Sequence, residues 1–120
     1  MFRDSKGHFK KIVKGFKGFF RAWSETKNTV VGTCIGKVYE AGKKYSEPEA
    51  EMCYRGMHFC KDPMDVLSYY SPGTNAVYST VEAPADQLAK SRDVPVSDTK
   101  VCTNELQVGP TLMDIYRYTS

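Results

Sequence analysis

Four cysteines and two histidines are the side chains best suited to chemistry in this sequence of 120 residues. Cys53, His58 and Cys60 lie close together, and Cys34 and Cys102 lie on either side of them. Thiolate and imidazole groups in a tetrahedral set of four are the ligands that zinc prefers. We therefore predict a structural zinc site whose ligands are Cys34, Cys53, His58 and Cys60, with Cys102 as the substitute.

The same side chains allow two other interpretations. The sequence has no Cys-x-x-Cys pair, and small thiols often fill buried cores without binding metal. A cysteine nucleophile needs a histidine base on another wall of a cleft, and His58 is too near Cys60 in sequence for that arrangement. Carboxylates are scattered over predicted loops, and no glycine loop has the phosphate-binding pattern. We therefore expect no catalytic residues, and a protein that binds rather than an enzyme.

Secondary structure must bring these side chains together. Residues 57–60 are short and mostly apolar, as in a buried strand, which places His58 and Cys60 on one face. Asp62 and Pro63 then suit the first positions of a helix, since Asp62 can accept from free backbone N–H groups and proline needs no N–H there. Val66, Leu67 and Tyr70 fall on one apolar face of this helix, and Pro72 ends it before a loop.

Residues 9–23 allow two structures. Their apolar spacing fits one helix face, with a basic opposite face, but Gly15 and Gly18 each disfavour a helix by about 1 kcal/mol. A strand over residues 11–16 is the favoured alternative. Basic side chains of the segment are Lys10, Lys14, Lys17 and Arg21.

The remaining patterns predict strands and short helices in one α+β domain over residues 1–120, with residues 1–8 as a mobile lead-in. We expect about five short, mostly antiparallel strands and two or three short helices. Further strands are predicted within 29–39, 76–82 and 100–108, a turn over 42–44 and a surface loop over 46–51. Helical turns are predicted within 84–90 and 110–116, the latter with Leu112, Ile115 and Tyr116 packed inward.

Charge is distributed unevenly along the chain. Residues 1–28 contain eight Lys or Arg and two acids, whereas the remaining residues contain nine and twelve. This asymmetry indicates an anionic partner for the N-terminal part, either nucleic acid or an acidic protein surface. No apolar run approaches the roughly 20 residues of a membrane span, and no secretory pattern follows the basic N-terminus, so we expect a cytosolic protein.

The central motif resembles a small domain of unknown function that is common in bacteriophage genomes. The resemblance covers roughly residues 11–108 and has the form Gly-x-His-x-Cys, Pro-x-Asp-Val and Tyr-Tyr in the middle. Its matching residues are Lys14, Gly15, Phe16, Cys34, Gly36, Tyr39, Gly42, Lys43, Tyr45, Cys53, Gly56, His58, Cys60, Pro63, Asp65, Val66, Tyr69, Tyr70, Tyr78, Val81, Glu82 and Ala83.

The resemblance implies a phage accessory protein in the cytoplasm of an infected bacterium. Such small proteins often block host defence stoichiometrically, so we expect an anti-CRISPR protein that binds an RNA-guided nuclease effector. Glu47, Glu49 and Glu51, together with the carboxylates after residue 60, could present an acidic face to the basic nucleic-acid channel of such an effector. The basic N-terminal part favours nucleic acid or an acidic partner instead.

Two alternatives remain open. Residues 56–70 and Glu105 also resemble the strand, helix and late glutamate of ADP-ribosyltransferases, which implies NAD binding. Lys14 or Lys17 is a poor substitute for the arginine or histidine on the first strand of those enzymes. The other alternative is a nucleic-acid-binding phage accessory protein that uses the basic residues of segment 9–23.

Overall fold

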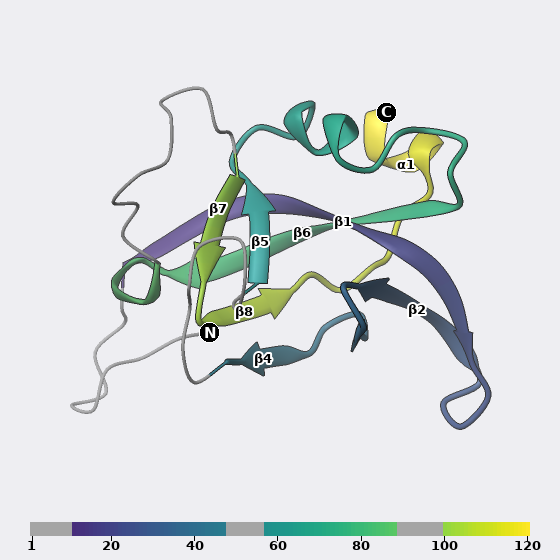
Figure 1. Cartoon of the computed structure of the whole chain (residues 1–120), viewed down its shortest axis with the longest axis horizontal. Helices are drawn as coiled ribbons and strands as arrows, with labels where there is room; N and C mark the ends of the chain where they lie inside the picture. Colours follow the sequence, from purple (N-terminus) through teal and green to yellow (C-terminus); the bar gives the residue numbers. More distant parts are fainter. Residues whose placement is uncertain (1–10, 48–56, 89–99) are drawn as a thin grey trace.

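The computed structural model describes residues 11–47, 57–88 and 100–120 (Figure 1). Within these ranges, eight strands form one curled sheet in which every strand pairing is antiparallel. The strands are β1 (Ile12–Ser24), β2 (Thr29–Cys34), β3 (Lys37–Tyr39), β4 (Lys44–Ser46), β5 (Met57–Cys60), β6 (Ala76–Pro84), β7 (Lys100–Thr103) and β8 (Glu105–Val108). The predicted α+β class is therefore corrected to a mostly β fold.

Helical structure is limited to three short segments in the described ranges. They are the 3-10 turns η1 (Asp65–Ser68) and η2 (Ala85–Gln87) and the helix α1 (Ile115–Thr119). The predicted helix with Asp62 as its cap is corrected to one 3-10 turn that begins at Asp65, with Met64 at the N-cap and no side-chain cap; Asp62 Oδ1 accepts the Met64 N–H at 2.9 Å in the turn before it. None of the three is long and apolar enough to cross a membrane.

Strand β1 has three partner strands in the sheet. β1 pairs with β6 over its first nine residues, with β2 over its last five, and with β5 at Phe16. The strand interpretation of this segment is confirmed, and the strand is longer than predicted. Its glycines allow close packing, because a Cβ on Gly15 would lie 2.4 Å from the Phe59 ring and one on Gly18 would lie 2.6 Å from the Tyr70 ring.

A buried core fills the concave side of the sheet. Phe19 from β1, Phe59 from β5 and Leu106 from β8 are almost completely buried there. Burying side chains of this size stabilises a fold by about 1.5–3 kcal/mol each. A second cluster contains Tyr78 from β6, whose hydroxyl donates to the Tyr70 carbonyl at 2.7 Å and whose ring stacks on Tyr118.

Three other sequence expectations need correction. The segment predicted as one strand over 100–108 is two strands, β7 and β8, divided at Asn104. Residues 44–46, expected as a turn and loop, form β4 because they pair with β8. The closing helix begins at Ile115 rather than Pro110, and Tyr116, expected to pack inward, is 83% exposed. Residues 1–8 lie outside the described ranges.

Candidate functional site

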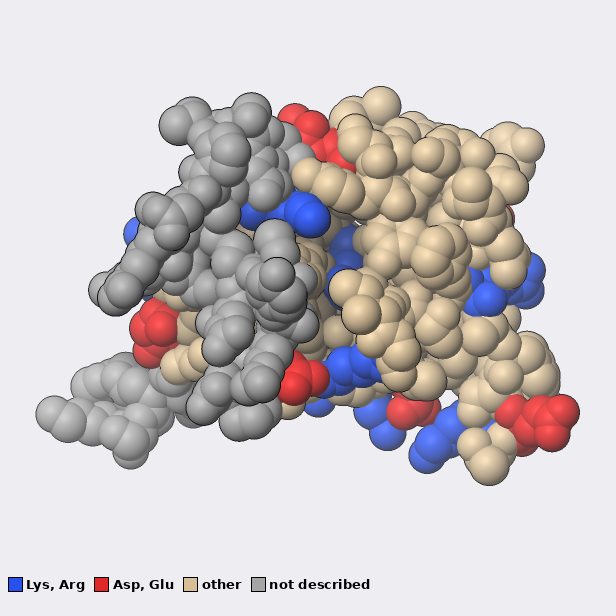
Figure 2. Space-filling model, viewed as in Figure 1, with Lys and Arg blue, Asp and Glu red and all other residues tan. Residues whose placement is uncertain are grey.

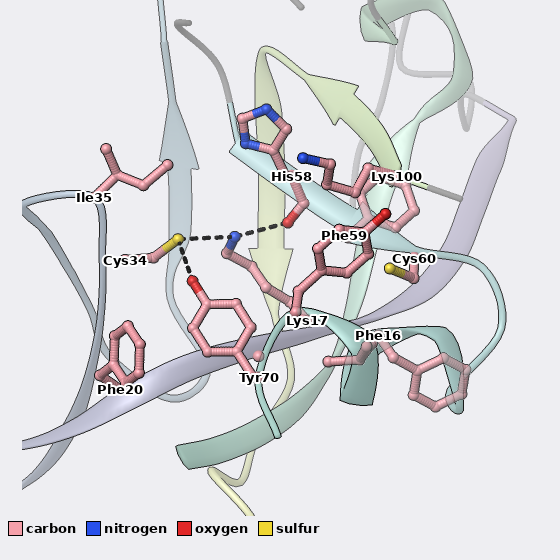
Figure 3. A pocket seen from close by; sticks show the side chains of 13 residues that line it. Phe16, Lys17, Phe20, Cys34, Ile35, His58, Phe59, Cys60, Tyr70 and Lys100 are labelled. Atoms are coloured by element: carbon pink, nitrogen blue, oxygen red, sulfur yellow. Dashed lines mark hydrogen bonds between the residues drawn. The ribbon is translucent and has the colours of Figure 1, made fainter. Parts of the chain in front are cut away.

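A pocket lies between β1, the end of β2, β5 and the segment that follows η1. Its volume is about 230 Å³. We call it the Lys17 pocket and define it by the side chains of Lys17, Cys34, His58, Phe59, Cys60 and Tyr70 (Figure 3). The walls are mainly apolar and aromatic, a composition typical of small-molecule and anchor-residue sites.

Lys17 lies inside this pocket with only 3% of its surface exposed. Its Nζ donates to the His58 carbonyl at 2.7 Å and lies 3.7 Å from Cys34 Sγ (Figure 3). The rings of Phe19 and Tyr39 have their centroids 5.4 Å from the same nitrogen. Desolvation by burial lowers the pKa of Lys17, and the neighbouring thiols, Cys34 first, partly oppose this shift.

The expectation that Lys17 belongs to a basic outer face is wrong. On β1, Lys17 lies on the same face as Gly15 and Phe19, which face the core, because alternate strand residues share a face. Lys14 and Arg21 are exposed, but an odd number of positions separates them, so the strand does not gather them on one face. Lys10 lies outside the described residues. Salt-dependent nucleic-acid binding through this segment stays a prediction.

Cys34 connects Lys17 to an aromatic hydroxyl. Its Sγ lies 2.9 Å from the Tyr70 hydroxyl (Figure 3). Burial raises the pKa of Tyr70 well above its ordinary value, and the contact with Cys34 adds to this effect. The phenol therefore keeps its proton at neutral pH, and the three groups form a continuous polar line from Lys17 through Cys34 to Tyr70.

The mouth of the pocket is apolar and exposed to solvent. Phe20, Ile35 and Tyr69 line it with exposed fractions of 47%, 83% and 41%. Lys100 places its Nζ 4.9 Å from the centroid of the Tyr69 ring. Ile35 has φ +49°, a left-handed conformation that is a genuine outlier for a β-branched residue.

The predicted zinc ligands are only partly placed. Cys34, His58 and Cys60 all line the Lys17 pocket, and buried Cys102 on β7 is the cross-strand neighbour of His58. Cys53 lies outside the described residues. Within the described part of the chain, no three His, Cys, Asp or Glu side chains form a group that could hold a metal ion. The zinc site stays a prediction, and a protonated Lys17 would compete with a zinc ion for the Cys34 sulfur.

Acidic residues do not gather into the expected face in the described part of the chain. Glu47 forms an ion pair with Lys37, and Glu40 pairs with Lys43 at 3.5 Å. In Figure 2, positive and negative side chains alternate along the lower right edge, acidic atoms lie at the top, and a broad uncharged area occupies the upper right of this face. Glu49 and Glu51 lie outside the described residues.

A family model for a domain of unknown function, DUF7666, matches residues 13–116. The chain belongs to this family. The expected membership of a family without known function is therefore confirmed, whereas the phage context and the anti-CRISPR function stay predictions. Searches of curated proteins and of solved structures gave no match.

Sequence reasoning missed two members of the DUF7666 pocket, Lys17 and Tyr70. The sequence did contain a signal for Lys17, because a strand extended past Phe16 places Lys17 on the same face as Gly15 and Phe19. Tyr70 was assigned to the apolar face of a helix, but its ring packs over Gly18. Glu105, the candidate of the NAD-binding alternative, pairs with Ser46 on β4 and is not part of the lining of the Lys17 pocket.

Proposed function

We propose that this domain works by binding, and that it docks on another protein through the mouth of the Lys17 pocket. Ile35 is the observation that carries the proposal. Its left-handed conformation disfavours the turn by about 1–2 kcal/mol relative to glycine. Its side chain is nevertheless apolar and 83% exposed. Strained backbone conformations cluster at functional sites, and Ile35 adds its exposed side chain to the apolar mouth of the pocket.

The surroundings of Ile35 extend this argument. Phe20 and Tyr69 are partly exposed aromatic side chains on the same mouth, and the pocket volume of about 230 Å³ is enough for one anchoring side chain. Buried anchors surrounded by apolar contacts supply most of the energy of protein interfaces. Lys100 at the mouth favours a partner that carries acidic groups beside its anchor.

The partner we propose is a bacterial defence protein, and specifically an RNA-guided nuclease of a CRISPR system. The domain would then be a phage-encoded stoichiometric inhibitor in the cytoplasm of the infected host. The sequence resemblance supports the phage context, and the apolar mouth supports a protein partner. Because Lys100 at the mouth is basic, this surface suits an acidic patch of the effector better than its basic nucleic-acid channel.

A cleavage assay tests this proposal. Purified domain is added in increasing amounts to a guide-loaded nuclease with a labelled DNA target, and the cleaved fraction is measured. We expect inhibition that is complete near one domain per nuclease. Ile35→Asp should raise the concentration needed for half inhibition at least tenfold, because a charge replaces the exposed apolar contact.

Tyr116→Ser is the matched control, since Tyr116 is as exposed as Ile35 but lies on α1 and is not part of the pocket lining. It should inhibit like the natural chain. Equal inhibition by the Ile35 and Tyr116 variants would exclude the mouth as the docking surface. No inhibition by the natural chain across effector types would exclude the proposed partner class.

A further inference from the structure

A second hollow lies across strands β1, β6 and β8. Its volume is about 580 Å³, which is within the range of roughly 300–1,000 Å³ that small-molecule sites occupy. It shares only Phe16 with the lining of the Lys17 pocket. We call it the Glu82 groove and define it by Lys14, Phe16, Thr80, Glu82, Gln107 and Gly109.

One side of the groove is a row of polar side chains. Lys14 on β1 pairs with Glu82 on β6, and Glu82 pairs with Gln107 on β8. Cross-strand partners project from the same face of a sheet, so an ammonium, a carboxylate and an amide are neighbours here. Gln107 Nε2 donates to the Gly42 carbonyl at 2.9 Å and to the Val108 carbonyl at 3.0 Å. These two bonds hold the amide in place and leave its Oε1 as an acceptor.

The other side combines an aromatic ring with open space. Phe16 pairs with Thr80 two positions further along the same two strands, and both side chains are at least partly exposed. The Gly109 N–H donates to the Thr80 carbonyl at 2.7 Å, so Gly109 continues this row onto β8 without a side chain. A Cβ at this position would overlap with Thr80 Oγ1. The glycine therefore keeps this end of the groove open.

The charges of the groove favour a ligand that is neutral and polar. In the part of the chain that the structure describes, no ion pair joins Lys14 or Glu82 to another residue. Their opposite charges lie side by side, so neither an anion nor a cation is attracted without also being repelled. Lys14 can only donate hydrogen bonds, ionised Glu82 can only accept them, and Thr80 can do both. Hydroxyl groups, which also donate and accept, match this arrangement.

We propose that the Glu82 groove binds a short, neutral oligosaccharide. Hydroxyls on the edge of a sugar ring exchange hydrogen bonds with Lys14, Glu82 and Gln107. The C–H groups on the face of the ring pack on Phe16, because the face of an aromatic ring carries partial negative charge. This inference does not depend on the protein partner proposed above, because the groove contains no residue of the mouth of the Lys17 pocket.

NMR titration of the isotope-labelled natural chain tests the site. Maltose, cellobiose, lactose and diacetylchitobiose are added one at a time, up to millimolar concentrations. We expect at least one sugar to shift the amide signals of Gly15, Thr80 and Gly109 saturably, while the signal of Gly32 on β2 stays unchanged. No saturable shift with any of the four sugars, or shifts confined to other parts of the sheet, would overturn the proposal.

Glu82→Gln tests the carboxylate in the groove. The variant keeps the size of the side chain and removes its charge. We expect at least tenfold weaker binding of the sugar, because hydrogen bonds to an ionised acceptor are stronger than those to a neutral one. Glu25→Gln is the control, since it removes an exposed carboxylate outside the groove and should bind the sugar like the natural chain. Equal affinities of the two variants would overturn the proposal.

Thr80→Trp tests the space of the groove. Thr80 is exposed in the middle of β6, where an aromatic side chain suits a strand, so the variant should fill the groove and abolish binding. Unchanged amide signals of buried Phe19 and Leu106 would show that the core is intact. Sugar binding that persists in this variant would place the ligand elsewhere and overturn the proposal.

Charged probes test the class of ligand. Free alanine, a zwitterion, and inorganic phosphate, an anion, are titrated under the same conditions. We expect both to bind more weakly than the best sugar, and tighter binding of either would overturn the assignment to a saccharide. The affinity for the sugar should change less than twofold between low and high salt, because a neutral ligand forms no ion pair that salt can screen. A tenfold loss at high salt would also contradict a neutral ligand.

Discussion

The two ends of strand β2 carry turns of opposite character. Residues 25–28 connect β1 to β2 with polar side chains, and Asn28 adopts φ +53°. Ser24 Oγ accepts the Lys27 N–H at 3.2 Å, which closes this turn. At the other end, Ile35 and Gly36 connect β2 to β3 with φ values of +49° and +74°. Asparagine suits a left-handed position, and isoleucine does not.

Asn28 suits the left-handed backbone conformation of its turn, whereas Ile35 is unfavourable in the same conformation, so folding does not explain the isoleucine. An Asn-Gly pair is favoured where two successive turn residues have positive φ, as in the turn after β2. The backbone conformation therefore does not explain the isoleucine beside Gly36. Ile35 lies at the mouth of the Lys17 pocket, whereas residues 25–28 are not part of its lining. The strained turn is therefore the one beside the candidate site.

Replacing Gly32, in the middle of β2, should have the largest effect because it disturbs the strand that both turns share. A Cβ at this position would lie 2.6 Å from the Cβ of fully buried Phe19. We expect Gly32→Ala to lower the free energy of unfolding by about 1–3 kcal/mol, measured by urea denaturation. Thr29→Ala, at the exposed start of β2, should change it by less than about 0.5 kcal/mol. Equal effects would mean that β2 shifts freely over Phe19.

Asn28→Ile transfers the unfavourable residue to the polar turn. We expect a loss of about 1–2 kcal/mol in the free energy of unfolding, because a β-branched side chain clashes with the backbone in the left-handed conformation. Lys27→Ile is the control, since it adds the same apolar surface one residue earlier. If both variants lose the same amount, exposed apolar surface rather than conformation is responsible.

Ile35→Asn makes the reverse change and should have the smallest effect on stability, with the opposite sign. We expect a gain of about 0.4–1 kcal/mol from relief of strain, together with weaker inhibition of the nuclease. Thermal denaturation and the cleavage assay measure the two quantities on one preparation. A gain in stability with unchanged inhibition would mean that Ile35 is merely a poor turn residue.

Local patterns were sufficient for much of the sheet. Alternation over 76–82 predicted β6, and the β-branched segment 29–39 predicted β2 and β3. Local patterns failed where pairing decides structure. Lys44–Ser46 has no strong strand signal and is a strand because β8 pairs with it. Residues after Asp62 have good helical spacing but form only one 3-10 turn, and Tyr70 beyond it packs over Gly18 of β1.

Part of the candidate site could be predicted from the sequence. The strand period placed His58 and Cys60 on one face, and Cys34 was expected beside them; all three line the pocket. Lys17 was not expected there, because its burial requires β1 to be contacted both by its hairpin partner β2 and by β5 from a distant part of the chain. The charge of Lys17 suggested a solvent-exposed side chain. Only the alternation along β1, which places Lys17 on the same face as Gly15 and Phe19, argued for burial.

The pairing of β1 with β6 has a consequence for how the chain reaches its fold during synthesis. Ile12 pairs with Pro84 and Phe20 with Ala76, so β1 leaves the ribosome well before its partner strand β6 has been synthesised. Contacts this distant in sequence slow folding, and proteins dominated by them fold in milliseconds to seconds. Until β6 emerges, the aromatic residues of β1 lack this pairing partner, and the nascent chain is most exposed to aggregation and chaperone binding in that interval.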